Sequence, residues 1–253
     1  MKRLWMVLTM VAVLAPMLPA QTKAAPKAVA PTATAPKAAA APKAAAPKAT
    51  AAKAATAAKA KREPAPDLLN PDTMRAKAPA IFVVRLETTK GNIDIRVVRA
   101  WAPNGVERIY NLVRAGYYNN NYFFRVLDFM AQTGISSDPR VNRVWGEKTL
   151  FDDRVVTSNI RGTVAMAASG SPNSRSTQFF INKKDANAYL DQLKFAVFGE
   201  VVEGMEVVDQ LYSGYGEPPI QGQLQEQGAP FIERNFPRMD KIIKASVIAV
   251  PQP

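Results

Sequence analysis

The spacing of hydrophobic and polar residues from position 80 onward predicts a folded domain. Residues 81–86 are rich in Ile, Val, Phe and Leu, and Ile93, Ile95 and Val97 alternate with polar residues. Alternation with a period of two is typical of a strand that buries one face. The turn-forming residues 89–92 lie between the two stretches, so we predict that the domain opens with a β-hairpin.

Two later stretches have the spacing of amphipathic helices. Residues 103–115 begin with proline, carry apolar residues at helical intervals and are followed by Gly116, and residues 203–212 show a similar apolar face. Short strand-like stretches fill much of the remainder: 122–127, 129–132, 163–168, 178–182, 197–201 and 242–250. Residues 213–237 are rich in Gly, Pro and Gln, and we predict no role for them. Many short strands with two helices favour a closed antiparallel barrel capped by helices.

The N-terminal part of the chain differs from this domain in composition. A charged start and an apolar run over residues 4–18 predict a signal peptide over residues 1–20, with cleavage after Ala20 or Ala24. An uncleaved membrane anchor is the alternative. We expect the protein to be exported to the periplasm or the extracellular space.

An Ala/Pro/Lys-rich linker is predicted over residues 21–79, between the signal peptide and a domain over residues 80–253. Ala-Pro-Lys occurs four times in it at irregular spacing. Recurrent proline prevents a continuous helix, and few large side chains are available to offset the entropy of ordering. We therefore expect the linker to be a disordered tether. Binding of its basic residues to an anionic surface is the alternative.

Charge and composition narrow the possible functions. The chain has 33 Lys/Arg and 21 Asp/Glu, of which residues 1–79 hold 13 and 3, so residues 80–253 hold 20 and 18. A nearly neutral domain argues against a nucleic-acid-binding face. The absence of Cys and His excludes thiolate chemistry, a Ser-His-Asp triad and His-ligated metal sites.

Several motifs occur in a fixed order along the domain. They are Tyr-Phe-Phe-Arg-Val-Leu-Asp-Phe-Met-Ala-Gln (122–132), Gly-Thr-Val-Ala-Met-Ala (162–167), Ser-Thr-Gln-Phe-Phe-Ile (176–181), Tyr-Leu-Asp (189–191) and Val-Phe-Gly-Glu-Val (197–201). In this order and with nearly this spacing, they resemble the cyclophilin-type peptidyl-prolyl cis-trans isomerases of the bacterial exported branch. The resemblance covers roughly residues 80–250.

This resemblance implies a mainly β fold, a closed eight-stranded antiparallel barrel with a helix over each opening. It also implies a hydrophobic groove on the outer face that holds a proline, with Arg125 as the catalytic residue. The implied substrate-binding residues are Phe129, Met130, Gln132, Ala167, Ala168, Gln178, Phe180, Tyr189, Leu190 and Phe195. In this set, Gln132 and Gln178 hydrogen-bond the substrate backbone and no cofactor is needed.

Strand alternation supports the implied site independently. Gln178 and Phe180 share one face of a strand while Phe179 lies on the other, so one strand can offer a polar contact and an apolar wall. For a single Phe, burial in the core is the alternative, and for Arg125 it is a surface salt bridge. A permanent donor suits prolyl isomerisation, because the twisted prolyl nitrogen regains its lone pair and no tuned pKa is required.

Three features depart from the family pattern. The stretch between Arg125 and Phe129 is one residue short, which either shifts Phe129 or is absorbed locally. Tyr189 stands where many members carry Trp, which puts cyclosporin sensitivity in doubt. Phe124 and Phe195 stand where eukaryotic members carry His, and we expect them to make the groove more apolar.

The expected function is therefore an isomerase that speeds the folding of exported proteins. Its expected partners are proline-containing polypeptides; we expect no nucleic acid, no stable membrane span and a monomeric state. One alternative is a proline-binding or chaperone module with little turnover, in which the short stretch misplaces Phe129. Another is an anchoring role for the basic tail.

Overall fold

The computed structural model describes residues 67–217 and 220–248. The predicted signal peptide and residues 21–66 of the predicted linker lie outside the described residues. The strands are β1 Ile81–Thr88, β2 Gly91–Val98, β3 Arg125–Val126, β4 Met130–Thr133, β5 Thr163–Met166, β6 Phe179–Asn182, β7 Val197–Glu203 and β8 Ile242–Ile248. The α-helices are α1 Pro103–Arg114, α2 Pro139–Trp145, α3 Met205–Asp209, α4 Gln221–Gln227 and α5 Ala229–Asn235, and the 3₁₀-helices are η1 Pro71–Thr73 and η2 Asp185–Asp191.

The opening hairpin forms as predicted. Strands β1 and β2 pair antiparallel from Ile81↔Val98 to Thr88↔Gly91, which leaves a two-residue connection. Gly91 has φ +134°, a conformation that L side chains rarely adopt, so glycine fits the turn. The buried positions of β1 alternate along the strand, as the sequence pattern requires.

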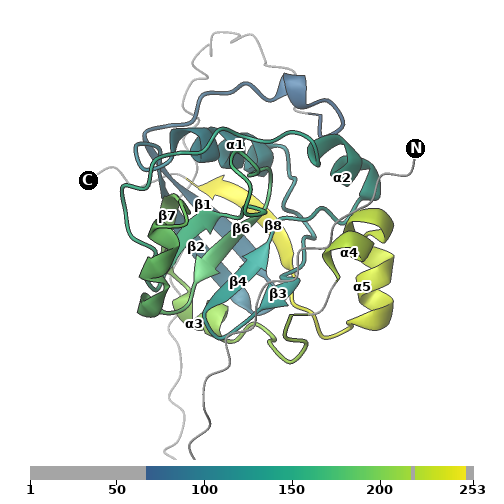
Figure 1. Cartoon of the computed structure of the whole chain (residues 1–253). Coiled ribbons are helices and arrows are strands. Elements are labelled where there is room, and N and C mark those ends of the chain that lie inside the picture. The colour runs from purple at the N-terminus through teal and green to yellow at the C-terminus, as the bar shows by residue number, and fades with distance from the viewer. Residues whose placement is uncertain (1–66, 218–219, 249–253) are drawn as a thin grey trace, which may run out of the picture. The chain divides into compact units, whose positions relative to one another are not determined.

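All eight strands belong to one antiparallel sheet in the order β3-β4-β6-β5-β7-β2-β1-β8 (Figure 1). The prediction of a closed barrel is wrong, because the end strands β3 and β8 form no ladder with each other. Only a bridge between Tyr122 and Lys241 joins the two ends, with Phe123 N donating to Asp240 O at 2.9 Å. Strand β3 is two residues long, too short to complete a ladder, and the barrel is therefore open on this side.

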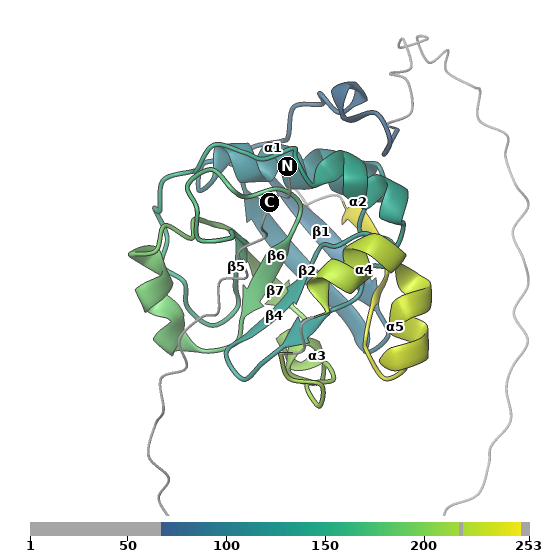
Figure 2. The same ribbon diagram turned by 45° about the vertical axis from the view of Figure 1, so that its right-hand side comes forward.

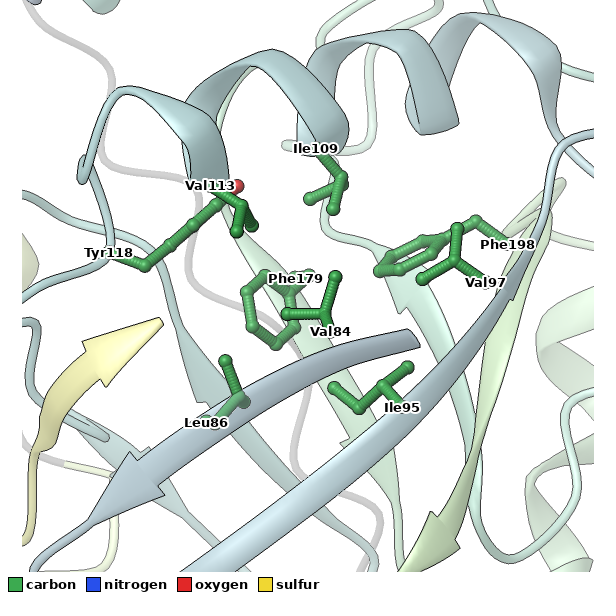
Figure 3. Close-up of a pocket in the computed structure, with 9 residues that line it drawn as sticks. All are labelled: Val84, Leu86, Ile95, Val97, Ile109, Val113, Tyr118, Phe179 and Phe198. Carbon is green, nitrogen blue, oxygen red and sulfur yellow. The ribbon is translucent and has the colours of Figure 1, made fainter. Parts of the chain in front are cut away.

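The inner face of the sheet and helix α1 enclose the main hydrophobic core. Figure 3 shows Ile109 and Val113 of α1 directed toward Val84 of β1 and Phe179 of β6. These side chains are buried, and Phe179 makes edge-to-face contacts with Tyr118 and Phe198 at 5.3 and 6.1 Å. The apolar stripe of α1 predicted from its spacing is thus the surface that covers the barrel interior.

The two-helix prediction was incomplete, because the described residues form five α-helices. Helices α4 and α5 arise from residues 213–237, to which the sequence assigned no role, and lie side by side beyond β3 (Figures 1 and 2). They pack onto a second cluster, here the flank cluster, beside the open side of the barrel. Its buried members are Tyr122, Phe124, Ile135, Ile220, Leu224, Ile232 and Met239, with Tyr215, Ala229, Phe231 and Phe236 packed against them.

Residues 67–79, assigned by sequence to the disordered linker, are instead ordered against the domain. Ala76 N donates to Asn111 Oδ1 at 3.0 Å, and Trp145 Nε1 donates to Leu68 O at 2.9 Å. Leu68 and Met74 also pack against the main core. The ordered part therefore begins before residue 80. No helix within residues 67–217 and 220–248 is long and apolar enough to cross a membrane.

Candidate active site

One row of cross-strand partners crosses the outer face of the sheet. Arg125 pairs with Gln132, Gln132 with Phe180, Phe180 with Ala165, and Ala165 with Val197. Directly opposed residues of antiparallel strands project to the same face, so these five side chains share one surface. Side chains at the alternate positions of these strands point into the barrel interior. The row thus brings an arginine and a glutamine next to an apolar surface.

The apolar part of this row belongs to a third cluster, here the outer cluster. Its buried members are Met130, Ala165, Phe180, Leu190 and Val197, and Trp101, Phe129, Ala167 and Phe195 pack against them. Phe180 and Phe195 meet edge to face at 5.6 Å. The structure therefore brings together six residues predicted for the groove: Phe129, Met130, Ala167, Phe180, Leu190 and Phe195.

Polar side chains border the outer cluster along a line of hydrogen bonds. Gln132 Nε2 donates to Gln178 Oε1 at 2.8 Å, and Arg125 Nη1 lies 3.4 Å from Gln132 Oε1. Arg125 Nη2 forms an ion pair with Glu217 Oε1 at 2.6 Å. The Arg125 side chain is 19% exposed, and its buried Nε has no hydrogen-bond partner in the described part of the chain. The guanidinium is thus held at the edge of an apolar surface.

The sequence missed three members of the outer cluster. Ala165 and Val197 could have been found by continuing the strand alternation across β5 and β7, because both share the face of Phe180. Trp101 lies just before α1, and nothing in its local sequence indicated the contact. The cluster therefore draws on more of the sheet than the motifs alone suggested.

Two predicted residues, Ala168 and Tyr189, lie outside the outer cluster. Ala168 is half-buried after β5, and Tyr189 is 52% exposed on η2 beside the buried Leu190. Their binding roles remain predictions. Phe124 does not make the groove more apolar, because it lies in the flank cluster under α4 and α5.

The stretch between Arg125 and Phe129 forms the connection between β3 and β4. Leu127 N donates to Met130 O at 2.8 Å and closes a tight turn, while Arg125 and Gln132 stay in register. The carbonyl of Phe129 accepts from Asn187 Nδ2 at 2.7 Å, and its side chain packs on the outer cluster. Whether the shorter stretch shifts Phe129 or is absorbed locally stays a prediction.

Asp191 anchors the 3₁₀-helix that carries Leu190. Its carboxylate accepts from Ser158 Oγ at 2.5 Å, from Asn159 N at 2.9 Å and from Asn159 Nδ2 at 2.7 Å. Burial opposes the charge of Asp191, but the hydrogen bonds from Ser158 and Asn159 outweigh it, and the pKa of this carboxyl is lowered. The ionised form therefore helps to hold one wall of the outer cluster.

A pH-dependent stability contribution follows from Asp191. Because its folded pKa lies below its unfolded value of about 3.9, the contribution is present above that value and is lost as the pH falls through the folded pKa. When the pH falls from about 5 to about 2.5, we expect Asp191→Asn to lose less free energy of unfolding than the wild type does. Urea denaturation at both pH values measures it, with Asp72→Asn, an exposed carboxylate on η1, as the control. Equal acid sensitivity of wild type and Asp191→Asn is the contrary result.

The fold is an open antiparallel barrel, and its outer face carries the Arg125 guanidinium beside the outer cluster. Such a surface can hold an apolar residue of a ligand next to a hydrogen-bond donor. The family model described as "Cyclophilin type peptidyl-prolyl cis-trans isomerase/CLD" matches residues 83–239, more than half of the chain. The chain therefore belongs to the cyclophilin-type peptidyl-prolyl cis-trans isomerases, which are isomerase enzymes.

Individual relatives agree with this assignment. Peptidyl-prolyl cis-trans isomerase A of Dickeya dadantii is 37% identical over 133 residues, which cover 51% of this chain and 70% of the relative. Peptidyl-prolyl cis-trans isomerase B of Escherichia coli is 35% identical and is covered to 83%, against 51% of this chain. A Cryptosporidium parvum cyclophilin structure has a TM-score of 0.51 at 23% identity and covers 68% of this chain and 99% of its own, which shows the shared fold.

Proposed function

We propose that the outer cluster holds the prolyl ring of a peptide while Arg125 faces the prolyl nitrogen, so that the chain isomerises X-Pro bonds at this surface. The observation that carries the proposal is the row from Arg125 through Gln132 to Phe180, which places a fixed donor directly beside an apolar wall. Peptide backbone contacts come from Gln178, which is half-buried and orders the amide of Gln132.

The chemistry requires no proton transfer. Rotation about the X-Pro bond has a barrier of about 18–20 kcal/mol, because the planar amide is conjugated. Twisting removes this conjugation and returns a lone pair to the nitrogen, which then accepts a hydrogen bond more strongly than in the planar form. A guanidinium at that position stabilises the twisted state over the ground state. Arginine is a permanent hydrogen-bond donor, so the step needs no acid–base partner.

Exchange spectroscopy on an Ala-Pro peptide tests this function directly. The full chain at a small molar fraction is expected to speed cis-trans exchange, which takes roughly tens to hundreds of seconds without a catalyst. Exchange unchanged by the protein, with peptide binding retained, favours the alternative of a proline-binding module with little turnover. That alternative depends on a displaced Phe129, and the packing of Phe129 on the outer cluster supports the isomerase proposal.

Substrate binding is expected to depend on Phe180. We expect Phe180→Ala to raise the dissociation constant of an Ala-Pro peptide by about 10-fold to 100-fold, since burying an aromatic side chain contributes roughly 1.5–3 kcal/mol. Peptide titration followed by NMR measures it. Ile243→Ala, which truncates an exposed apolar residue on β8, is the matched control. An unchanged dissociation constant for Phe180→Ala contradicts the assigned surface.

We further propose that the chain belongs to the exported bacterial branch and acts in the periplasm or extracellular space on the folding of exported proteins. The support is the charged start, the apolar run over residues 4–18 and the Ala/Pro/Lys-rich stretch that follows. Cell fractionation and N-terminal sequencing test the proposal. A mature N-terminus after Ala20 or Ala24 in an exported fraction supports it, and an intact Met1 in the cytoplasm contradicts it.

A further inference from the structure

The ion pair between Arg125 and Glu217 links the proposed active site to a segment to which the sequence assigned no role. Arg125 Nη2 and Glu217 Oε1 lie 2.6 Å apart, slightly closer than the roughly 2.7–2.9 Å usual for a charge-assisted hydrogen bond between nitrogen and oxygen. The two side chains differ in burial, since Arg125 is 19% exposed and Glu217 is 61% exposed. A carboxylate on the surface therefore reaches a largely buried guanidinium.

Residues close in sequence to each partner of this ion pair pack in the flank cluster. Phe124, which immediately precedes Arg125, is buried there. On the other side, Tyr215 packs against the same cluster two residues before Glu217, and Ile220 is buried in it three residues after. The flank cluster thus packs against the backbone next to Arg125 and against the backbone near Glu217.

A closed turn fixes the backbone next to Glu217. Gly216 N donates to Ser213 O at 2.9 Å, and Gly216 has φ +63°, in the left-handed region that favours glycine. The ring of Tyr215 meets Tyr212 at 4.9 Å and Phe236 at 5.1 Å, and its hydroxyl accepts from Arg238 N at 3.2 Å. The carboxylate therefore projects from an anchored turn.

The other contacts of the guanidinium are weak. The distance of 3.4 Å from Arg125 Nη1 to Gln132 Oε1 is long for a hydrogen bond, and Nε has no partner in the described part of the chain. The contact with Glu217 is the shortest that restrains this side chain. A long side chain loses considerable rotamer entropy when fixed, so a partner that orders Arg125 before substrate arrives lowers the cost of reaching the transition state.

We propose that Glu217 is a positioning residue that holds the Arg125 guanidinium in its working orientation, and that the turn over residues 213–216 presents it. This inference rests on the proposed role of Arg125. Glu217 contacts the guanidinium through Nη2, whereas Nη1 lies 3.4 Å from Gln132 Oε1 and Nε has no hydrogen-bond partner in the described part of the chain. The effect is expected on turnover more than on binding.

The first test separates kcat from KM with full-length variants and an Ala-Pro peptide. We expect Glu217→Ala to lower kcat by roughly tenfold with KM changed less than twofold, and Glu217→Gln to recover part of the loss because it keeps a hydrogen-bond acceptor. The melting temperature is expected to stay within about 2 °C, because Glu217 is 61% exposed and water can take its place at the guanidinium. Glu226→Ala, an exposed carboxylate on α4, is the control.

A double variant distinguishes positioning from a general structural effect. In the Arg125→Ala background, Glu217→Ala is expected to cause no further loss, because the residue it positions is absent. A further tenfold loss there overturns the inference, as does a lower KM with unchanged kcat, which indicates competition with substrate. If Arg125→Ala alone retains wild-type activity, the proposed function fails. If Arg125→Ala is inactive while Glu217→Ala matches wild type, only the positioning role fails.

Discussion

Replacing Arg125 by Ala is expected to lower kcat for Ala-Pro isomerisation by about 100-fold to 1,000-fold, the usual cost of losing a preorganised donor to the transition state. The guanidinium lies beside Gln132 at the edge of the outer cluster, where little water competes for it. The planar ground state makes little use of this donor, so peptide binding is expected to change less than threefold.

Two further variants show whether the effect of Arg125→Ala is specific to the guanidinium at this position. Arg125→Lys keeps the charge but loses the planar fork of donors, and we expect it to recover only part of the activity. Arg234→Ala removes an exposed arginine from α5 and serves as the control for loss of positive charge. Equal loss of binding and turnover in Arg125→Ala indicates a binding role in place of a catalytic one. Full activity in that variant contradicts the mechanism.

Replacing Phe179 by Ala is expected to lower the free energy of unfolding by about 3–5 kcal/mol, the range for truncating a buried Phe. Phe179 is 3% exposed and contacts the rings of Tyr118 and Phe198 inside the barrel. Figure 3 shows it at the centre of the side chains that connect α1 to the sheet. The surrounding strands are hydrogen-bonded on both sides and cannot collapse fully into the space left behind.

Urea denaturation measures this loss, with Phe151→Ala as the control because Phe151 is 78% exposed. The comparison with Phe180→Ala is informative, because the two neighbours on β6 point to opposite faces. Both rings are buried, so we expect both substitutions to lower stability, whereas only Phe180→Ala is expected to weaken peptide binding as well. Equal effects of both substitutions on peptide affinity contradict the division between an inner core and an outer binding surface.

The parts of the fold that could be predicted from the sequence depend on local patterns. The opening hairpin follows from alternation around a two-residue connection, and α1 follows from Pro103 and apolar residues at helical spacing. Part of the outer cluster could be predicted because several of its residues fall in short motifs on and around β4 and β6. Alternation placed Gln178 and Phe180 on one face, and the structure shows Phe180 in the outer cluster and Gln178 beside it.

The remaining features depend on contacts between distant parts of the chain. Helices α4 and α5 are short, carry Gly222 and Pro230, and have few apolar positions, so their burial comes from Tyr122 and Met239 in the flank cluster. The open side of the barrel reflects how residues 121–123 meet residues 240–242, which no local pattern encodes. For the same reason, the sequence could not indicate that Glu217 reaches Arg125.

The measurement that tests the account most directly locates the prolyl ring on the protein during catalysis. We would record intermolecular nuclear Overhauser effects between an Ala-Pro peptide and the full-length protein with labelled methionine and leucine methyl groups, under conditions of accelerated exchange. The account predicts contacts from the prolyl ring to Met130 and Leu190, both in the outer cluster. Accelerated exchange with prolyl contacts confined to another surface, such as Leu224 of the flank cluster, would contradict it.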